Sequence, residues 1–318
     1  MIKISLKAKR TPDSVDPAIQ MEDSFEKFMR YCKAKNLAIS TLVNYRREFK
    51  SFHMFYTGNI YDISFDTVIQ YIEHLQKRGI ATTSINTALR HMRAIINYWI
   101  EQGLCNPVKI KLLRVNEEIK VTYTDEEISR LLKKPNVKTA SFREYRTWAI
   151  INFFIGTGCR LSTLTAIKIG DIDWDNCMIA YAHTKNNKAQ YTPLSTALSA
   201  VLREYISYRG GVGNDLLFPS ENNTKLATTS VAHTIAIYNK KRGVEKTSCH
   251  LFRHTFAKNW ILSNGDPMRL QRILGHATLT MSQHYSNLYK TDLKAGFEDF
   301  NLLSRLKTDD KIRLRGKK

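Results

Sequence analysis

The amino-acid sequence predicts a mainly α-helical protein with a small antiparallel β-sheet, organised as two domains. Through most of the 318 residues, apolar side chains recur every three or four positions, as they do on one face of an α-helix. Two runs of strand-forming residues separated by a turn, which are typical of a β-hairpin, occur clearly only between residues 172 and 194. Residues 106–123 have no clear period, and we expect them to link the two parts.

The composition favours a polyanionic partner, above all nucleic acid. The net charge is +20 with a pI of about 9.7, and basic residues occur along the whole chain. A hydrophobic fraction of 43% excludes global disorder. Five cysteines without a C-x-x-C pair indicate reduced thiols, a cytoplasmic location and no zinc knuckle. The longest apolar run, residues 148–155, is too short to span a bilayer, so we expect no membrane association.

The first part reads as a polar, flexible arm over residues 1–20 followed by four helices over residues 21–105. The second helix is expected to start at Ser40, because serine is a favourable N-cap, and the third is expected after Ser64 or Phe65. Gly79 and Gly103 are expected to end the third and fourth helices. Arginines and lysines lie mostly off the apolar faces, which suits DNA but equally suits an ordinary helical domain. The expected inward residues are Phe25, Phe28, Met29, Cys32, Leu42, Tyr45, Phe49, Phe52, Tyr56, Val68, Tyr71, Ile72, Leu75, Ile85, Leu89, Met92, Ile96 and Trp99.

The second part opens with a capping box, in which Thr124 and Glu127 stand three apart before an apolar run. Residues 142–155 are apolar on two sides and predict a buried helix. The glycines at 156 and 158 predict a tight turn and a new helix starting at Arg160 or Leu161, with Leu164 and Ile167 inward. Arg160 would then lie at a helix start, where an anion is favoured, unless it is a plain surface arginine after a loop.

A β-hairpin is expected next, with strands near residues 172–183 and 191–194. The sequence K-N-N-K, from Lys185 to Lys188, reads as its turn. Helices are then expected over residues 197–208, 228–241 and 278–289. Asp266 and Pro267 are expected to open a further helix that carries Leu270, Ile273 and Leu274. A detached amphipathic segment over residues 292–306 could dock on another surface.

The sequence from His250 to Tyr285 carries the chemistry. His250 and Arg253 stand three apart, His276 follows in L-G-H, and Tyr285 comes nine positions later. Attack on a phosphodiester without a metal needs fixed arginines for the phosphate oxygens and a proton for the leaving oxygen. It also needs a nucleophile that forms a covalent bond, and a tyrosine can supply one.

Taken in order, the motifs G-T-G-C-R-L-S, H-T-K, H-L-F-R-H, L-G-H and the later tyrosine resemble the tyrosine recombinase (phage integrase) family. The resemblance covers roughly residues 22–305. It implies a helical, SAM-like core-binding domain over residues 21–105 and a linker over 106–123. An α/β catalytic domain would follow over residues 124–290, with a C-terminal exchange helix and basic tail over 291–318.

The resemblance also implies a metal-independent reaction without a cofactor. Two arginines would grip the scissile phosphate, a histidine would accept a proton or add a phosphate contact, and a lysine would protonate the 5′-oxygen. A second histidine would hydrogen-bond the transition state, and a tyrosine would form a 3′-phosphotyrosyl link. These residues are, in turn, Arg160 and Arg253, His250, Lys185, His276 and Tyr285. Lys188 and Tyr289 are the rivals of Lys185 and Tyr285, and His254 and His284 are assigned to packing or DNA backbone contact.

The implied partners are double-stranded DNA recombination sites, which a homo-tetramer would join through a Holliday junction. Accessory DNA-bending or directionality proteins could assist, and a mobile element or Xer-like resolution would be the setting. The chain departs from the family at Thr163, where an acidic residue usually supports the first arginine. A type IB topoisomerase or an inactive DNA-binding protein would be the alternatives.

Overall fold

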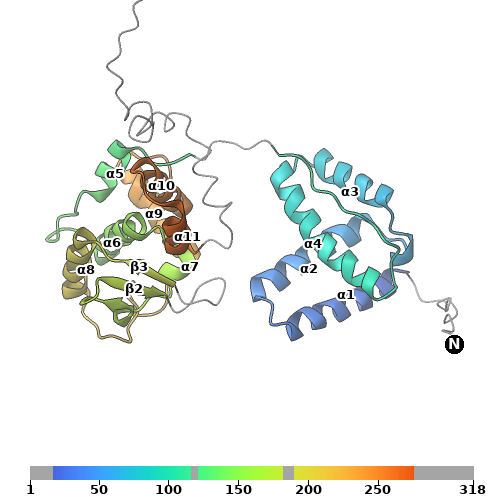
Figure 1. Ribbon diagram of the computed structural model, residues 1–318, viewed down its shortest axis with the longest axis horizontal. Coiled ribbons are helices and arrows are strands. Elements are labelled where there is room, and N and C mark those ends of the chain that lie inside the picture. The colour runs from blue at the N-terminus through green and yellow to red at the C-terminus, as the bar shows by residue number, and fades with distance from the viewer. Residues whose placement is uncertain (1–16, 116–120, 182–189, 276–318) are drawn as a thin grey trace, which may run out of the picture. The chain divides into compact units, whose positions relative to one another are not determined.

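The chain divides into two compact units, Met1–Glu118 and Ile119–Lys318. The structure is a computed structural model that describes residues 17–115, 121–181 and 190–275 (Figure 1). Within these ranges it is mostly helical and has one three-stranded antiparallel sheet, so the predicted fold class is confirmed. No helix in the described ranges is both long and apolar enough to cross a membrane.

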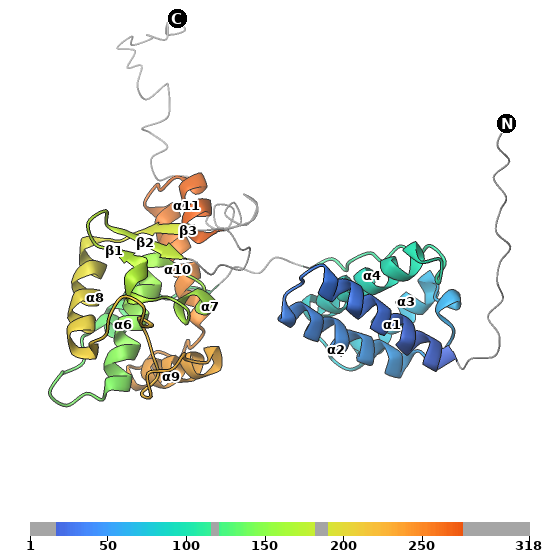
Figure 2. The ribbon, with the colours of Figure 1, turned by 90° about the horizontal axis from the view of Figure 1, so that it is seen from below.

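Four helices form the N-terminal unit, and α4 packs against the other three (Figure 2). The bounds are α1 Pro17–Ala34, α2 Ile39–Phe55, α3 Phe65–Lys77 and α4 Thr82–Glu101, with a short 3-10 helix at Ile60–Asp62. The predicted inward residues lie in its core, fully buried or partly so. Helix α3 follows Ser64, one of the two predicted starts, and the Ser64 side chain caps it. Gly79 and Gly103 adopt the left-handed conformation just after α3 and α4.

Two helix starts differ from the prediction. Helix α1 begins at Pro17, inside the segment expected to be an arm, and Met21 is already completely buried. Proline is well tolerated at this position, because the first N–H groups of a helix need no partner within the helix. Helix α2 begins at Ile39 after Ala38 and has no side-chain cap, so Ser40 is not its N-cap.

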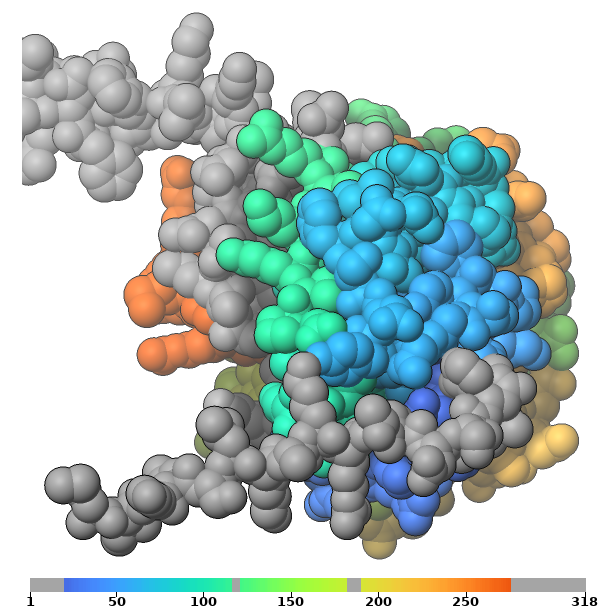
Figure 3. Space-filling view, turned by 90° about the vertical axis from the view of Figure 1, so that its right-hand side faces the viewer, coloured from blue at the N-terminus to red at the C-terminus, as the bar shows by residue number. Residues whose placement is uncertain are grey.

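The segment after α4 packs on the N-terminal unit instead of linking freely. Asn86 on α4 donates from Nδ2 to the carbonyl of Leu113 at 2.9 Å and accepts from its N–H at 2.8 Å. Ile110 is also buried, and Figure 3 shows the blue-green end of this unit lying along its edge. At the other end of the expected linker, the N–H of Tyr123 donates to Thr255 in the second unit. The described residues at both ends of the expected linker therefore contact the units beside them.

Helix α6, Phe142–Thr157, is the centre of the second unit. Four helices pack against it: α5 Asp125–Leu132, α8 Thr196–Arg209, α9 Thr228–Lys241 and α10 Cys249–Leu262. Its Ala149, Phe153 and Phe154 are completely buried, which confirms the prediction of a buried helix. The predicted capping box at the start of α5 is also present.

A small sheet lies beside these helices, in the order β1 Ile172–Asp173, β2 Met178–Tyr181 and β3 Gln190–Pro193. Both strand pairs are antiparallel, and Ile179 faces Thr192 across the second pair. The strands of the predicted hairpin are therefore confirmed, whereas its turn lies outside the described residues. Helix α11, Pro267–Leu274, packs on β3 (Figure 2).

Asn86→Ala should release the segment that ends at Leu113. Both hydrogen bonds are lost, which leaves the backbone groups of Leu113 unpaired, and such a loss costs roughly 1–3 kcal/mol. We expect the free energy of unfolding of the N-terminal unit, measured by urea denaturation, to fall by that amount. The control is Asn97→Ala, the same change at an exposed position of α4. An equal loss in both variants would contradict the role of Asn86.

Candidate active site

A left-handed turn at Gly158 carries the chain from α6 to Arg160. Gly158 has φ of 61°, and its N–H donates to the carbonyl of Phe154 at 2.8 Å, which ends the helix. A Cβ at this glycine would lie 2.7 Å from the Phe256 ring and 2.8 Å from Leu274. Gly156, which we expected to share in the turn, lies within α6 and allows a close approach to Leu198. One glycine therefore makes the turn, and the other serves helix packing.

The helix predicted after Arg160 is only one turn long. Helix α7 spans Leu161–Leu164, with Arg160 as its N-cap residue. Leu164 and Ile167 are buried as expected, but Ile167 lies beyond the helix. Because the dipole of so short a helix is weak, the helix start adds little to the predicted binding of an anion beside Arg160. The guanidinium of Arg160 is therefore the group at this position that would bind an anion.

Helix α10 supplies two of the predicted site residues. The N-cap Ser248 accepts a hydrogen bond from the N–H of His250 at 3.3 Å, so His250 lies in the first turn, where it is exposed. Arg253 follows one turn later, and only 3% of it is exposed. Its Nη1 donates to the carbonyl of Gly158 at 2.9 Å, and its Nη2 donates to the carbonyl of Leu274 at 2.8 Å.

The end of α11 joins both arginines. Arg160 donates from Nη1 to the carbonyl of Leu274 at 3.3 Å and from Nη2 to that of Gly275 at 3.1 Å. The oxygen of Leu274 therefore accepts from Arg160 and Arg253 together. Gly275 has φ of 61°, which ends the helix and turns these carbonyls toward the arginines. The structure thus brings the two predicted phosphate-binding arginines side by side.

The surroundings leave the arginines charged. Arg160 is half-buried, and this desolvation lowers the pKa of its guanidinium, which still stays protonated at any physiological pH. Among the described residues, its hydrogen-bond acceptors are backbone carbonyls and not carboxylates. Burial raises the pKa of the nearby Cys159 thiol to about 12, so it remains neutral. Thr163, at the usually acidic position, is buried, and the carbonyls at the end of α11 provide the contacts to Arg160.

Two histidines lie together on α10. The rings of His250 and His254 are 4.6 Å apart and nearly perpendicular. His254 is buried, which favours packing, one of the two roles expected for it, over contact with the DNA backbone. In the described part of the chain, no three His, Cys, Asp or Glu side chains gather in a way that could hold a metal ion.

Three predicted site residues, Lys185, His276 and Tyr285, lie outside the described residues, as do Lys188, His284, Tyr289 and the segment 292–306. The structure does describe residues that flank two of these segments. His276 directly follows Gly275, whose carbonyl accepts from Arg160. Lys185 belongs to the connection between β2 and β3, and β3 packs on α11.

Gln190 is a site-supporting residue that the sequence analysis missed. It is the first residue of β3, and its Nε2 donates to the carbonyl of Ile273 at the end of α11. A Cβ at Gly275 would collide with the same side chain. Gln190 therefore fixes the strand that follows Lys185 to the helix end that holds both arginines. A glutamine at a strand start carries no distinctive sequence signal, so only the structure reveals this contact.

Comparisons with known proteins agree with these motifs. The profile of the phage integrase family matches residues 122–292, and that of the phage integrase N-terminal SAM-like domain matches residues 25–104. The chain belongs to the phage integrase family. Members of this family are tyrosine recombinases, so the chain is a site-specific DNA recombinase that cleaves and rejoins DNA. The topoisomerase and inactive alternatives are not favoured.

Relatives and solved structures resemble this recombinase over most of its length. It is 28% identical to the tyrosine recombinase XerA of Thermococcus kodakarensis, over 77% of this chain and 85% of that protein. It is 22% identical to the tyrosine recombinase XerC of Roseiflexus castenholzii, over 84% of this chain and 90% of that protein. In fold it resembles the XerH recombinase bound to a palindromic difH substrate, with a TM-score of 0.76 and 18% identity. This match covers 91% of this chain and 98% of that chain. It also resembles the Tn1549 transposon integrase in complex with circular intermediate DNA, with a TM-score of 0.70 and 19% identity. This match covers 83% of this chain and 94% of that chain.

Gly158→Ala should disturb the arginine pair through the backbone. An alanine in a left-handed conformation costs roughly 1–2 kcal/mol, and overpacking against Phe256 and Leu274 adds about 1–3 kcal/mol. We expect a lower free energy of unfolding for the catalytic unit, by chemical denaturation, and slower DNA cleavage by the folded fraction.

The matched control is Gly243→Ala. Its φ of 66° is similar, but the added Cβ would meet only the flexible end of the Arg130 side chain. We expect this variant to show the left-handed cost without the loss of cleavage. If both variants cleave DNA equally slowly, the packing at Gly158 does not position the arginines.

Proposed function

We propose that this recombinase cleaves one DNA strand by attack of the Tyr285 hydroxyl on the scissile phosphorus. The proposal rests chiefly on one observation: the guanidinium groups of Arg160 and Arg253 both donate to the carbonyl of Leu274. Segments from three places in the sequence therefore meet at one point, and His276 is the next residue but one. A pair of adjacent arginines suits a phosphate that gains negative charge during attack.

The two arginines would bind the non-bridging oxygens of the phosphate. Arg160 uses two of its five N–H groups on carbonyls, and the others have no partner among the described residues. Because the carbonyls hold the guanidinium before DNA binds, little reorganisation is needed when charge develops. His250, exposed at the start of α10, would accept a proton or add a phosphate contact.

The remaining residues take the roles that the resemblance to the family implies. As the bond from the Tyr285 oxygen to phosphorus forms, the tyrosine hydroxyl loses its proton, for which His250 is the proposed acceptor. The bond from phosphorus to the 5′-oxygen breaks, and Lys185 gives that oxygen a proton. His276 would donate a hydrogen bond to the phosphoryl group. The free 5′-hydroxyl of a second duplex then attacks the phosphotyrosine, which restores the tyrosine and conserves the bond energy. Neither a metal nor a cofactor enters these steps.

Exchange between two duplexes breaks four strands, and each chain offers one Tyr285. We therefore propose a homo-tetramer on two recombination sites, which passes through a Holliday junction. The amphipathic segment over residues 292–306 would dock on a neighbouring copy. Accessory DNA-bending or directionality proteins would set the direction, in the service of a mobile element or of Xer-like resolution, and the protein would act in the cytoplasm on the nucleoid.

Tyr285→Phe should abolish the covalent protein–DNA adduct, because phenylalanine lacks the attacking oxygen. The substrate is a duplex selected from a random pool by the full chain and nicked near the cleavage point, so that religation is prevented. We expect the wild-type chain to form a denaturation-resistant adduct in the presence of EDTA, measured on a denaturing gel, and the variant to bind DNA without forming one.

Tyr289→Phe is the matched control, and this variant should keep the adduct. If the adduct persists in Tyr285→Phe and disappears in Tyr289→Phe, the nucleophile is Tyr289. A requirement for a divalent metal in the cleavage step would instead indicate a nuclease mechanism.

Lys185→Ala should slow cleavage by about 10²–10⁴-fold, because the 5′-oxygen then leaves without a proton. Replacement of that bridging oxygen by sulfur should restore the rate, since a thiolate is a good leaving group without protonation. The rate of adduct formation on the two substrates is the measurement. Lys188→Ala should cleave both substrates at similar rates to the wild type, and a sulfur rescue specific to Lys188→Ala would reverse the two roles.

A further inference from the structure

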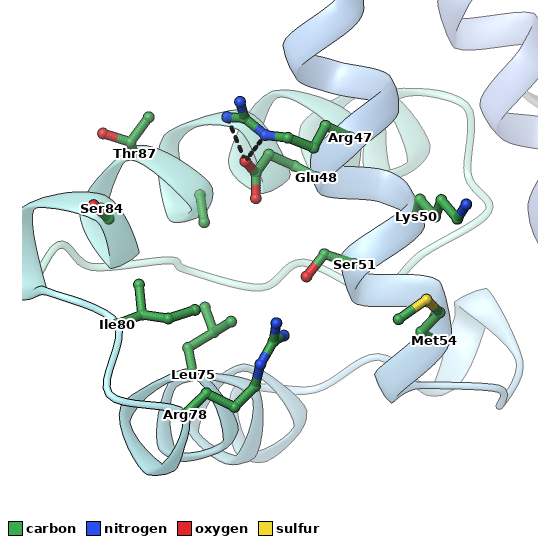
Figure 4. A pocket seen from close by; sticks show the side chains of 11 residues that line it. Arg47, Glu48, Lys50, Ser51, Met54, Leu75, Arg78, Ile80, Ser84 and Thr87 are labelled. Carbon is green, nitrogen blue, oxygen red and sulfur yellow. Dashed lines mark hydrogen bonds and ion pairs between the residues drawn. The ribbon is translucent and has the colours of Figure 1, made fainter.

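A basic pocket of about 750 Å³ opens on the N-terminal unit between α2, the end of α3 and the start of α4 (Figure 4). Three exposed cations, Arg47, Lys50 and Arg78, line it, and Arg78 reaches toward its centre from the end of α3. The floor includes the buried Leu75 and the buried carboxylate of Glu48. A carboxylate at the base of a basic pocket is unusual for a surface that only attracts phosphates.

Glu48 is tied to its neighbour Arg47. The side chain of Glu48 is 11% exposed and that of Arg47 is 62% exposed. One oxygen, Oε1, accepts from Nε of Arg47 at 3.0 Å and from Nη2 at 2.8 Å (Figure 4). A buried carboxylate requires such a partner, and the pairing holds the long arginine side chain in one direction at the mouth of the pocket.

This pairing leaves the end of the guanidinium available. Glu48 contacts the side formed by Nε and Nη2, so both N–H groups of Nη1 and the second N–H of Nη2 remain. Among the described residues, Nη1 has no hydrogen-bond partner. Two parallel N–H groups at this end match the O6 and N7 acceptors of guanine in the major groove.

We propose that Arg47 reads a guanine of the recombination site and that Glu48 is the residue that positions it. This inference rests on the proposed function, because it assigns part of the DNA specificity to the N-terminal unit. The adjacent carboxylate offsets the charge of Arg47, which weakens its pull on a phosphate, but it fixes the direction that a base edge requires. Lys50 and Arg78 have no carboxylate partner within the described ranges, and they are left to contact phosphates.

The test is selection of random duplexes by the full-length chain, followed by sequencing of the bound DNA. Arg47→Ala should lose the preference for guanine at one position of the selected site and bind that site about 10- to 100-fold more weakly. Glu48→Gln should relax the same preference while binding to unrelated DNA is kept or strengthened. Thermal melting checks that both variants fold, and Arg47 is exposed enough for Arg47→Ala to remain informative if Glu48→Gln is unstable.

Arg46→Ala is the matched control. Arg46 is also an exposed, ion-paired arginine on α2, but its partner is Glu26 and it does not line the pocket. Its replacement should leave the base preferences unchanged. If Arg47→Ala instead weakens binding equally for all sequences and lowers the salt dependence by about one phosphate contact, Arg47 binds a phosphate and the inference is wrong.

Unchanged preferences in Arg47→Ala would also overturn the inference, because the pocket would then not read DNA. These outcomes differ from failure of the proposed function. In that case the wild-type chain would select no preferred sequence, or its selected site would yield no covalent adduct with Tyr285.

Discussion

The carbonyl oxygen of Leu274 is the point on which the described part of the active site depends. It accepts from Arg160 and Arg253, two cations that would otherwise repel each other. The end of α11 is the negative end of a helix, so its carbonyls suit this role. A change in the position of α11 must therefore move both guanidinium groups at once. The phosphate contacts that we propose are set by backbone atoms more than by side-chain partners.

The apolar core around α6 makes this arrangement rigid. Gly158 ends α6, contacts Phe256 and Leu274, and offers its own carbonyl to Arg253. Burial of Arg253 is tolerable because two carbonyls satisfy its guanidinium. Gln190 extends the same network to β3, and hence to the chain that carries Lys185. The proposed phosphate-binding arginines belong to different elements, but packing on the end of α11 relates those elements to each other.

Amphipathic spacing predicted most helices correctly, because a buried face leaves a periodic trace, as in Val68, Tyr71, Ile72 and Leu75. Ordered motifs pointed to Arg160 and Arg253 as a pair, and the structure places both guanidinium groups on the carbonyl of Leu274. The packing of residues 106–115 on the N-terminal unit could not be predicted, because it depends largely on hydrogen bonds between Asn86 and the backbone of Leu113. The hydrogen-bond acceptors of the arginines could not be predicted either, because every residue has a backbone carbonyl. The direction of the carbonyls that accept here depends on how α11 ends. Gly156 and Gly158 look alike in sequence, but only packing tells which one turns the chain.

The two kinds of arginine in this protein differ in what holds them. Backbone carbonyls hold Arg160, so it keeps a full positive charge, which suits a phosphate whose negative charge grows during the reaction. A carboxylate holds Arg47, so the pair is nearly neutral while its direction is fixed. Such a pair gains little binding energy from a phosphate, because its net charge is small. It gains more from a base edge whose acceptors lie opposite the fixed N–H groups of Arg47. If both proposals hold, the acceptor beside each arginine separates the task of catalysis from the task of recognition.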